Sequence, residues 1–326
     1  MIVTITPSPS IDWTVTLDSF ALGVVNRASD SVREPSGKGV NVSVALHRAG
    51  IPTRAIIPAG GDSGRFLALA LRAHGLPITL IETNTEIRTN ITLITPGYLG
   101  TKINEPGSPL SQDAVACLHE AVLGTAGEAS AVVSCGSLPP GLPASFHRDI
   151  VRLTKTLGVY SAVDASGEPL ALALTARPDL VKPNVHELAE LAECSITTLG
   201  EVVAAAQTIR QRGAGAVLAS LGGDGVIYVD ALGALHAKAE GIPVINTVGA
   251  GDALLAGFMG GGGERVARLA NAVLWASSAV AAPSTLFTVD PDFAAFITVS
   301  PQINAATKLH EPSEKLARLT AGETSG

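Results

Sequence analysis

Short strand-like runs that alternate with longer helix-like runs most restrict the fold of this chain. Residues 53–59 are followed by a helix-like run at 63–74, and residues 129–134 by another at 143–157. Further runs of the same kind lie at 159–164, 179–182, 198–212 and 214–220. Strands and helices that alternate in this way are typical of a doubly wound parallel sheet. We therefore expect a three-layer α/β/α core.

Two segments interrupt this alternation, at residues 11–33 and 87–104. Both contain strand-like runs without helices between them, and a Pro96-Gly97 turn divides the second segment. Strands joined by tight turns form antiparallel sheets more readily than parallel ones. The pattern predicts a small antiparallel sheet outside the core, which would act as a lid over an active site.

The length and composition indicate one large domain. The chain has 326 residues, of which 46% are hydrophobic and 16% charged, so it can bury a large core. We expect residues 1–307 to form this domain. Residues 308–326 are polar, contain Pro312 and Gly322, and lack an apolar face, so a frayed helix or disorder is predicted there.

Charge, hydropathy and cysteine content narrow the function classes. A net charge of -7 argues against nucleic acid as the main partner. Residues 1–7 are typical of a core strand rather than a secretory leader, and no apolar run reaches membrane-spanning length, so a cytoplasmic location is expected. Cys117, Cys135 and Cys194 are widely spaced and predict neither a disulfide framework nor a zinc site. All three are expected to be small buried hydrophobes.

The strongest candidate for chemistry is the segment 246–252, which reads Asn-Thr-Val-Gly-Ala-Gly-Asp and precedes a helix-like run. Gly249 and Gly251 allow backbone N–H groups to converge at the start of that helix, a geometry that binds anions. The carboxylate of Asp252 stands at its edge. The segment therefore predicts a place where a phosphoryl group is transferred, although helix-start statistics alone favour a capping role for Asp252 about equally.

A second glycine-rich segment, Ser-Gly-Lys-Gly-Val-Asn at 36–41, precedes a helical run at 42–49. Glycines on both sides of Lys38 suggest backbone held close to a ligand at a helix start. The segment is not a Walker A loop, and no convincing GxGxxG follows the first strand. P-loop and dinucleotide-binding folds are therefore disfavoured.

Three more segments have ordinary interpretations when each is considered by itself. Lys182, Asn184 and Glu187 lie where a strand enters a helix, and a helix cap with an acidic first turn explains them adequately. Residues 220–225 are typical of a glycine-rich hairpin, and residues 136–141 of a strand-to-helix loop.

In this order, the motifs resemble those of the PfkB (ribokinase-like) family of carbohydrate kinases, from Thr4 to about Phe296. The matching elements are residues 36–41, Lys182-Pro183-Asn184 with Glu187, Ser220 with Gly222 and Gly225, and residues 247–252. The resemblance is strongest to the phosphosugar branch, which holds 1-phosphofructokinase, tagatose-6-phosphate kinase and the minor 6-phosphofructokinase. The segments that carry it are 6–12, 25–27, 88–90, 136–141 and 164–167. Ser36 departs from the pattern, because the family usually has glycine there.

The resemblance implies a ribokinase-like fold and an ATP- and magnesium-dependent phosphosugar kinase. Asp252 would be the catalytic base, and the backbone of Gly249, Ala250 and Gly251 would form the anion hole. Asn184 and Glu187 would organise hydrated Mg²⁺. The residues implied to bind the nucleotide are Lys182, Asn184, Glu187, Ser220, Gly222, Gly225 and Asn271.

For the acceptor, the resemblance implies a site made by Asp12, Arg27, Gly37, Lys38, Gly39, Asn41, Arg88, Asn90 and Ser137. Arg88 is the best candidate for the substrate phosphate, with Arg27 and Lys38 as helpers. Fructose 1-phosphate is the favoured acceptor, and fructose 6-phosphate and tagatose 6-phosphate are alternatives. A ribokinase, a nucleoside kinase and a non-catalytic sugar-phosphate sensor are remoter alternatives, and a homodimer through the lid is expected.

Overall fold

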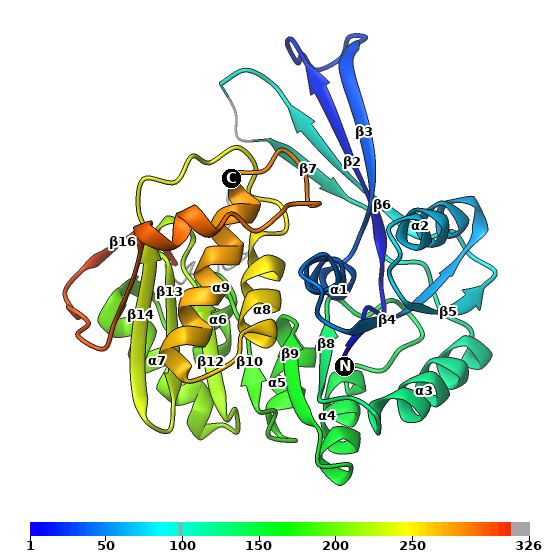
Figure 1. The fold of residues 1–326 in the computed structure, drawn as a ribbon. Coiled ribbons are helices and arrows are strands. Elements are labelled where there is room, and N and C mark those ends of the chain that lie inside the picture. Colours follow the sequence, from blue (N-terminus) through cyan, green and yellow to red (C-terminus); the bar gives the residue numbers. More distant parts are fainter. Residues whose placement is uncertain (98–99, 314–326) are drawn as a thin grey trace, which may run out of the picture.

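The computed structural model describes residues 1–97 and 100–313, which fold around one large mixed β-sheet (Figure 1). Its strands are β1 (Ile2–Ile5), β4 (Thr53–Gly60), β5 (Ile78–Thr83), β8 (Ala131–Cys135), β9 (Tyr160–Asp164), β10 (Leu180–Val181), β12 (Ala216–Ser220), β13 (Val226–Asp230), β14 (Gly233–Ala239) and β15 (Ile297–Ser300). They lie in the order β15-β14-β13-β12-β10-β9-β8-β1-β4-β5. All neighbours from β5 to β12 are parallel, whereas β13, β14 and β15 extend the sheet in antiparallel fashion. The predicted doubly wound core is confirmed, with an antiparallel edge.

Helices cover both faces of this sheet and complete three layers (Figure 1). One layer contains α1 (Lys38–Arg48), α2 (Gly61–Ala73), α8 (Ala250–Gly260) and α9 (Arg265–Val280). The other contains α3 (Gln112–Ala126), α4 (Phe146–Thr156), α5 (Gly167–Leu174), α6 (Val185–Ala192) and α7 (Leu199–Gln211). Short 3₁₀ turns lie at Gly222–Asp224 and Pro291–Phe296. Of the helices in the described ranges, none is both long and apolar enough to cross a membrane.

The two cores follow from the period-two geometry of the strands. In β8, Ala131 and Val133 pack with Leu255 of α8, whereas Val132 between them packs with Leu118 of α3. Successive side chains of a strand point to opposite faces, so an apolar run without polar interruption must be buried on both sides. The polar side chains of the central strands, such as Thr4, Ser134 and Ser161, are also buried, and each is hydrogen-bonded to another side chain.

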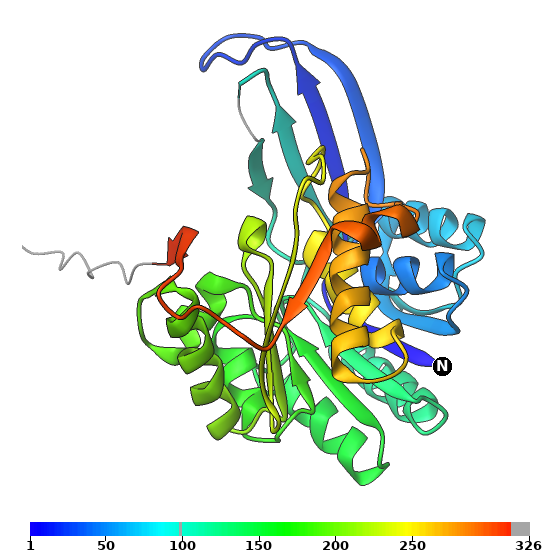
Figure 2. The same cartoon turned by 60° about the vertical axis from the view of Figure 1, so that its left-hand side comes forward.

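A second sheet projects from the main one and forms the lid (Figures 1 and 2). It consists of β2 (Ser10–Leu17), β3 (Ala28–Ser36), β6 (Arg88–Ile94) and β7 (Thr101–Asn104), in the order β3-β2-β6-β7. The prediction that its strands are all antiparallel is wrong, because β2 and β6 are parallel. Both follow parallel strands of the main sheet, β1 and β5, and therefore leave the same sheet edge in the same direction.

The prediction of a frayed helix or disorder is also wrong for the start of the C-terminal segment. Residues Lys308–Ser313 form strand β16, which pairs antiparallel with β11 (Ile196–Thr198). Leu309 is buried in the core beneath α6 and α7. A single apolar anchor in a polar strand leaves no periodic signal, so tertiary contacts rather than local pattern specify this element. Residues 314–326 lie outside the described residues.

The cysteines only partly match their prediction. All three are free, but Cys135 alone is fully buried, Cys194 is intermediate and Cys117 is exposed. Cys117 lies on α3 next to Leu118, which belongs to the stripe that faces the core. A neighbour one position away points elsewhere on a helix, which accounts for its exposure.

Candidate functional site

Asp252 lies in the first turn of α8, at the carboxyl edge of the parallel strands. Gly249 caps this helix with a left-handed backbone, φ 79°, which a residue with a side chain rarely adopts. The Asp252 side chain is only 8% exposed, and Asn41 Nδ2 on α1 donates to its Oδ2 at 2.8 Å. Lys182 Nζ lies 3.5 Å from where a Cβ on Gly251 would stand. The predicted anion hole, the carboxylate and a lysine therefore meet at one point.

The surroundings of Asp252 make its carboxyl a weaker acid. Burial raises its pKa to about 6, and the negative charge of Asp164 acts in the same direction. The Asn41 hydrogen bond and the charges of Lys182 and Lys38 oppose this rise. A carboxylate with a pKa near neutrality is suited to accept and release a proton.

A buried ion cluster supports this centre. Asp164, at the end of β9, pairs with Lys38 Nζ at 2.7 Å and Lys182 Nζ at 3.1 Å, and Lys38 also lies 3.7 Å from Glu187. Burial disfavours the charged forms of Asp164 and Lys38, but their pairing prevails, so the pKa of Asp164 is lowered and that of Lys38 is raised. Asp164 was not predicted as a site residue. Its position as the last residue of a core strand was the available signal.

Three of the residues predicted to bind the acceptor, Asp12, Arg88 and Asn90, meet at the base of the lid. Asp12 on β2 accepts hydrogen bonds from Asn90 Nδ2 at 3.0 Å, Ser10 Oγ at 3.1 Å and Ser36 Oγ at 2.7 Å. Neither Ser10 nor Ser36 was predicted to take part. Asp12 is thus held by three donors from three strands, β2, β3 and β6.

Arg88 lies beside this group with unused hydrogen-bonding capacity. It is half-buried, and its Nη2 donates to the backbone carbonyl of Ser8 at 3.3 Å. Within residues 1–97 and 100–313, the buried atoms Arg88 Nε and Asn90 Oδ1 have no hydrogen-bond partner. Buried polar atoms are normally paired, so a donor on a cation next to an unpaired amide oxygen indicates that a polar ligand completes the site.

Arg27 is not brought to this group within one chain, which corrects the prediction that it helps Arg88. Arg27 is exposed and precedes Ala28, which pairs with Leu17 near the lid tip, whereas Arg88 pairs with Ser10 at the base. Seven residues of strand separate these two positions on β2, which is roughly 23 Å at 3.3 Å per residue. An arginine side chain cannot span that distance.

The glycines on either side of Lys38 pack closely against Thr6, the residue that follows β1. A Cβ on Gly37 would stand 2.8 Å from Thr6 Cγ2, and one on Gly39 would stand 2.5 Å from Thr6 Oγ1. Their small size is therefore required by α1 packing. Ser137, in the loop after β8, is exposed.

On the predicted nucleotide side, Asn184 and Glu187 form a capping box at the start of α6. Asn184 Oδ1 accepts from the backbone N–H groups of His186 and Glu187, and Glu187 Oε2 accepts from Asn184 N at 2.8 Å. Asn184 also lies in a β-bridge with Ser220. Asn271 Nδ2 donates to Gly257 O at 2.6 Å, which joins α9 to α8.

The loop at Gly222–Asp224 is held by the C-terminal strand. The buried carboxylate of Asp224 accepts from the backbone N–H of His310 on β16 at 2.7 Å and also contacts the His310 imidazole. Gly225, at φ 87°, could not carry a side chain, because a Cβ would stand 2.2 Å from Ala237 O. Backbone packing and β16 together fix the loop.

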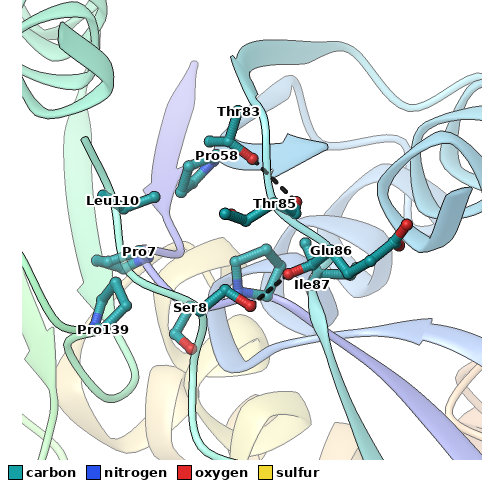
Figure 3. A pocket seen from close by; sticks show the side chains of 11 residues that line it. Pro7, Ser8, Pro58, Thr83, Thr85, Glu86, Ile87, Leu110 and Pro139 are labelled. Carbon is teal, nitrogen blue, oxygen red and sulfur yellow. Dashed lines mark hydrogen bonds between the residues drawn. The ribbon is translucent and has the colours of Figure 1, made fainter. Parts of the chain in front are cut away.

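A small cavity lies next to the lid base but is not large enough for a sugar (Figure 3). Its volume is about 20 Å³, which holds roughly one water molecule. Figure 3 shows Pro7, Pro58 and Pro139 around it, together with Ser8, whose backbone carbonyl accepts from Arg88. A cavity of this size does not form the acceptor site.

Comparisons with known proteins identify a matching family model and several similar chains. The family model described as "pfkB family carbohydrate kinase" matches residues 6–285. A 1-phosphofructokinase of Bacillus subtilis (strain 168) is 34% identical over 262 residues, which cover 80% of this chain and 85% of that protein. A tagatose-6-phosphate kinase of Staphylococcus epidermidis is 30% identical over 264 residues, with 80% and 85% covered. The crystal structure of phosphofructokinase-2 from Escherichia coli matches with a TM-score of 0.82 and 29% identity, over 90% of this chain and 97% of that chain.

Proposed function

We propose that this chain, which belongs to the pfkB family of carbohydrate kinases, transfers a phosphoryl group from ATP to fructose 1-phosphate and forms fructose 1,6-bisphosphate. Membership of the family makes it a phosphotransferase with a sugar hydroxyl as acceptor. The observation that carries the acceptor class is the half-buried Arg88, whose Nε has no partner among residues 1–97 and 100–313. A second phosphate on the acceptor would accept from this guanidinium.

Proton removal is assigned to Asp252. Asn41 holds Oδ2 of its carboxylate at 2.8 Å, which orients the group toward the centre between α1 and α8. The carboxylate would take the proton from the acceptor hydroxyl as the oxygen attacks phosphorus, and the bond from phosphorus to the ADP oxygen would break. A proton acceptor with a pKa of about 6 is ionised at neutral pH.

Charge on the transferring phosphoryl group would be stabilised by the start of α8 and by lysine. The backbone N–H groups at Gly249–Gly251 lie at the positive end of the helix dipole. Lys182 Nζ is beside Gly251, and Asp164 holds it there at 3.1 Å. Because these donors are held before substrate binds, little reorganisation is needed during the reaction.

Magnesium fits this site only as a hydrated ion on the triphosphate. In the described part of the chain, no group of three or more His, Cys, Asp or Glu residues could hold a metal. Asn184 Oδ1 is already used by the helix cap, so Glu187, whose Oε1 faces Lys38, is the better candidate to contact metal-bound water. Mg²⁺ commonly keeps several waters and binds substrate phosphates, where it neutralises charge.

A substrate panel tests the proposal. Purified protein with ATP and Mg²⁺ is offered fructose 1-phosphate, fructose 6-phosphate, tagatose 6-phosphate, ribose and adenosine, and ADP release is measured. The highest kcat/KM is expected for fructose 1-phosphate and none above background for ribose or adenosine. A higher kcat/KM for another ketose phosphate would identify that sugar as the acceptor instead. Silence throughout would contradict the kinase and favour a sensor of sugar phosphates.

The pH profile tests the role of Asp252. The folded pKa of Asp252 is raised, so the base is lost as pH falls through about 6, and kcat/KM should decline below that pH with a slope of one. Asn41→Ala removes a donor that favours the charged form, so the acid limb should move to higher pH. Asn26→Ala, at the lid tip, should leave the profile unchanged. An acid limb that is identical in Asn41→Ala would contradict the assignment.

We also propose a homodimer through the lid, active in the cytoplasm, where ATP and sugar phosphates are available. The loop between β2 and β3 exposes Phe20 by 49%, Leu22 by 87%, Val24 by 63% and Val25 by 78%. An apolar group of this kind on a projecting sheet is typical of an interaction surface. Sedimentation of the purified protein measures whether two chains associate, and a dimer is expected.

A further inference from the structure

The side chain of Ser36 has a defined contact, although the family usually has glycine at this position. Ser36 ends β3 immediately before Gly37 and is 3% exposed. Its Oγ donates to Asp12 Oδ2 at 2.7 Å, while Asn90 and Ser10 donate to Oδ1. Among the three donors, Ser36 is the one that contacts Oδ2, and its hydrogen bond is the shortest of the three.

We propose that Ser36 is a positioning residue for the acceptor, acting through Asp12, an inference that rests on the proposed function. With Oδ1 held by two donors and Oδ2 by one, the plane of the carboxylate is fixed against rotation. The remaining lone pairs of Asp12 are then directed to the sugar hydroxyls before substrate arrives. Loss of the Ser36 hydroxyl frees one carboxylate oxygen, and substrate binding must then restrict it.

The backbone at Ser36 shows that serine is accommodated without strain. The described residues with a side chain and a positive φ are Arg177 and Glu193, so Ser36 is not among them. The left-handed turn occurs at the next residue, Gly37, with φ 131°. The serine therefore leaves the start of α1 intact and adds a donor to the site.

Ser36 also links the lid to the reaction centre. It pairs with Ser10 at the base of the lid, and α1 begins two residues later at Lys38. Lys38 contacts Asp164, and Asn41 on the same helix contacts Asp252. The hydroxyl thus fixes the acceptor carboxylate relative to the helix that carries two residues of the reaction centre.

Steady-state kinetics with both substrates test the proposal. Ser36→Ala should raise KM for the phosphosugar about 5- to 20-fold, which is less than the roughly 10- to 150-fold of a direct hydrogen bond to a charged group, because the hydroxyl acts through Asp12. KM for ATP and kcat should change by less than about twofold. Ser36→Gly should behave like Ser36→Ala, since both lack the hydroxyl. Ser29→Ala, an exposed serine on the same strand, serves as the matched control and should match the wild type.

A double-mutant cycle separates positioning from a structural or direct role. In an Asp12→Ala background, Ser36→Ala should change kcat/KM for the phosphosugar by less than about twofold, because no side-chain oxygen remains at position 12 to accept from Ser36 and be oriented. An equal loss in both backgrounds, or an unchanged KM in Ser36→Ala, would overturn the inference. A wild type that phosphorylates no phosphosugar would instead overturn the proposed function. The two failures are therefore distinguishable.

Discussion

Asp252→Asn is expected to lower kcat by roughly 10² to 10⁴, the usual contribution of a general base. The amide is nearly the same size as the carboxylate, so α8 should keep its place, but it cannot accept the proton of the acceptor hydroxyl. KM for either substrate should change little, because the anion hole is made by backbone N–H groups. Rapid-quench or coupled measurement of ADP formation gives kcat, and near-normal turnover would contradict the assignment.

The same substitution should stabilise the fold at neutral pH. The folded pKa of Asp252 is raised from 3.8 to about 6, so the folded chain holds this proton more tightly than the unfolded chain. The free energy of unfolding therefore falls as pH rises through this range, and a neutral Asn removes that loss. Lower activity together with a higher Tm at pH 7 would show that the charge of Asp252 destabilises the fold and is retained because catalysis requires it.

Asp62→Asn is the matched control, because Asp62 is also an aspartate in the first turn of a helix, α2. It is exposed and paired with Arg65, away from the reaction centre. If the first-turn charge mattered only through the helix dipole, both variants would behave alike. We expect Asp62→Asn to keep wild-type kcat.

Arg88→Ala is expected to raise KM for the phosphosugar roughly 10- to 100-fold, as expected for hydrogen bonds to a charged group. KM for ATP should stay the same, because Arg88 lies at the lid base rather than near Asn184 or Ser220. Arg88→Lys should be intermediate, since it keeps the charge but loses the planar fork. Initial rates at varied phosphosugar concentration, and separately at varied ATP concentration, give the two KM values.

Arg33→Ala is the control for Arg88. Arg33 also lies on a lid strand, but its guanidinium stacks over the Trp13 ring, with the carbon 4.3 Å from the ring centre. It should leave phosphosugar KM unchanged. An Arg88→Ala enzyme with wild-type KM for every phosphosugar would remove Arg88 from the acceptor site.

Local motifs account for what could be predicted from the sequence. Gly249, Gly251 and Asp252 lie within four residues, so their spacing alone determines that backbone donors and a carboxylate meet at a helix start. The capping box of Asn184 and Glu187 is equally local, and its structural interpretation was available from the sequence. The alternation of strands and helices likewise predicted the three layers.

Contacts between distant segments could not be predicted in the same way. Lys38 and Asp164 are 126 residues apart, and no periodicity indicates that they pair. The parallel pairing of β2 with β6 depends on where β1 and β5 leave the sheet. The distance between Arg27 and Arg88 follows from the register of the lid strands, and this register cannot be deduced from the residue types at the two positions.

The loop at Gly222–Asp224 lies inside the region that matches the family model, but His310, which holds this loop through Asp224, lies outside it. The family model ends at residue 285, whereas His310 lies beyond it. A chain shortened to the matched region would keep all the recognised motifs but lose β16, and with it the contacts that hold the Asp224 carboxylate and its loop in place. If the loop binds the nucleotide as the sequence predicts, changes in β16 would alter nucleotide affinity while every motif residue stays the same.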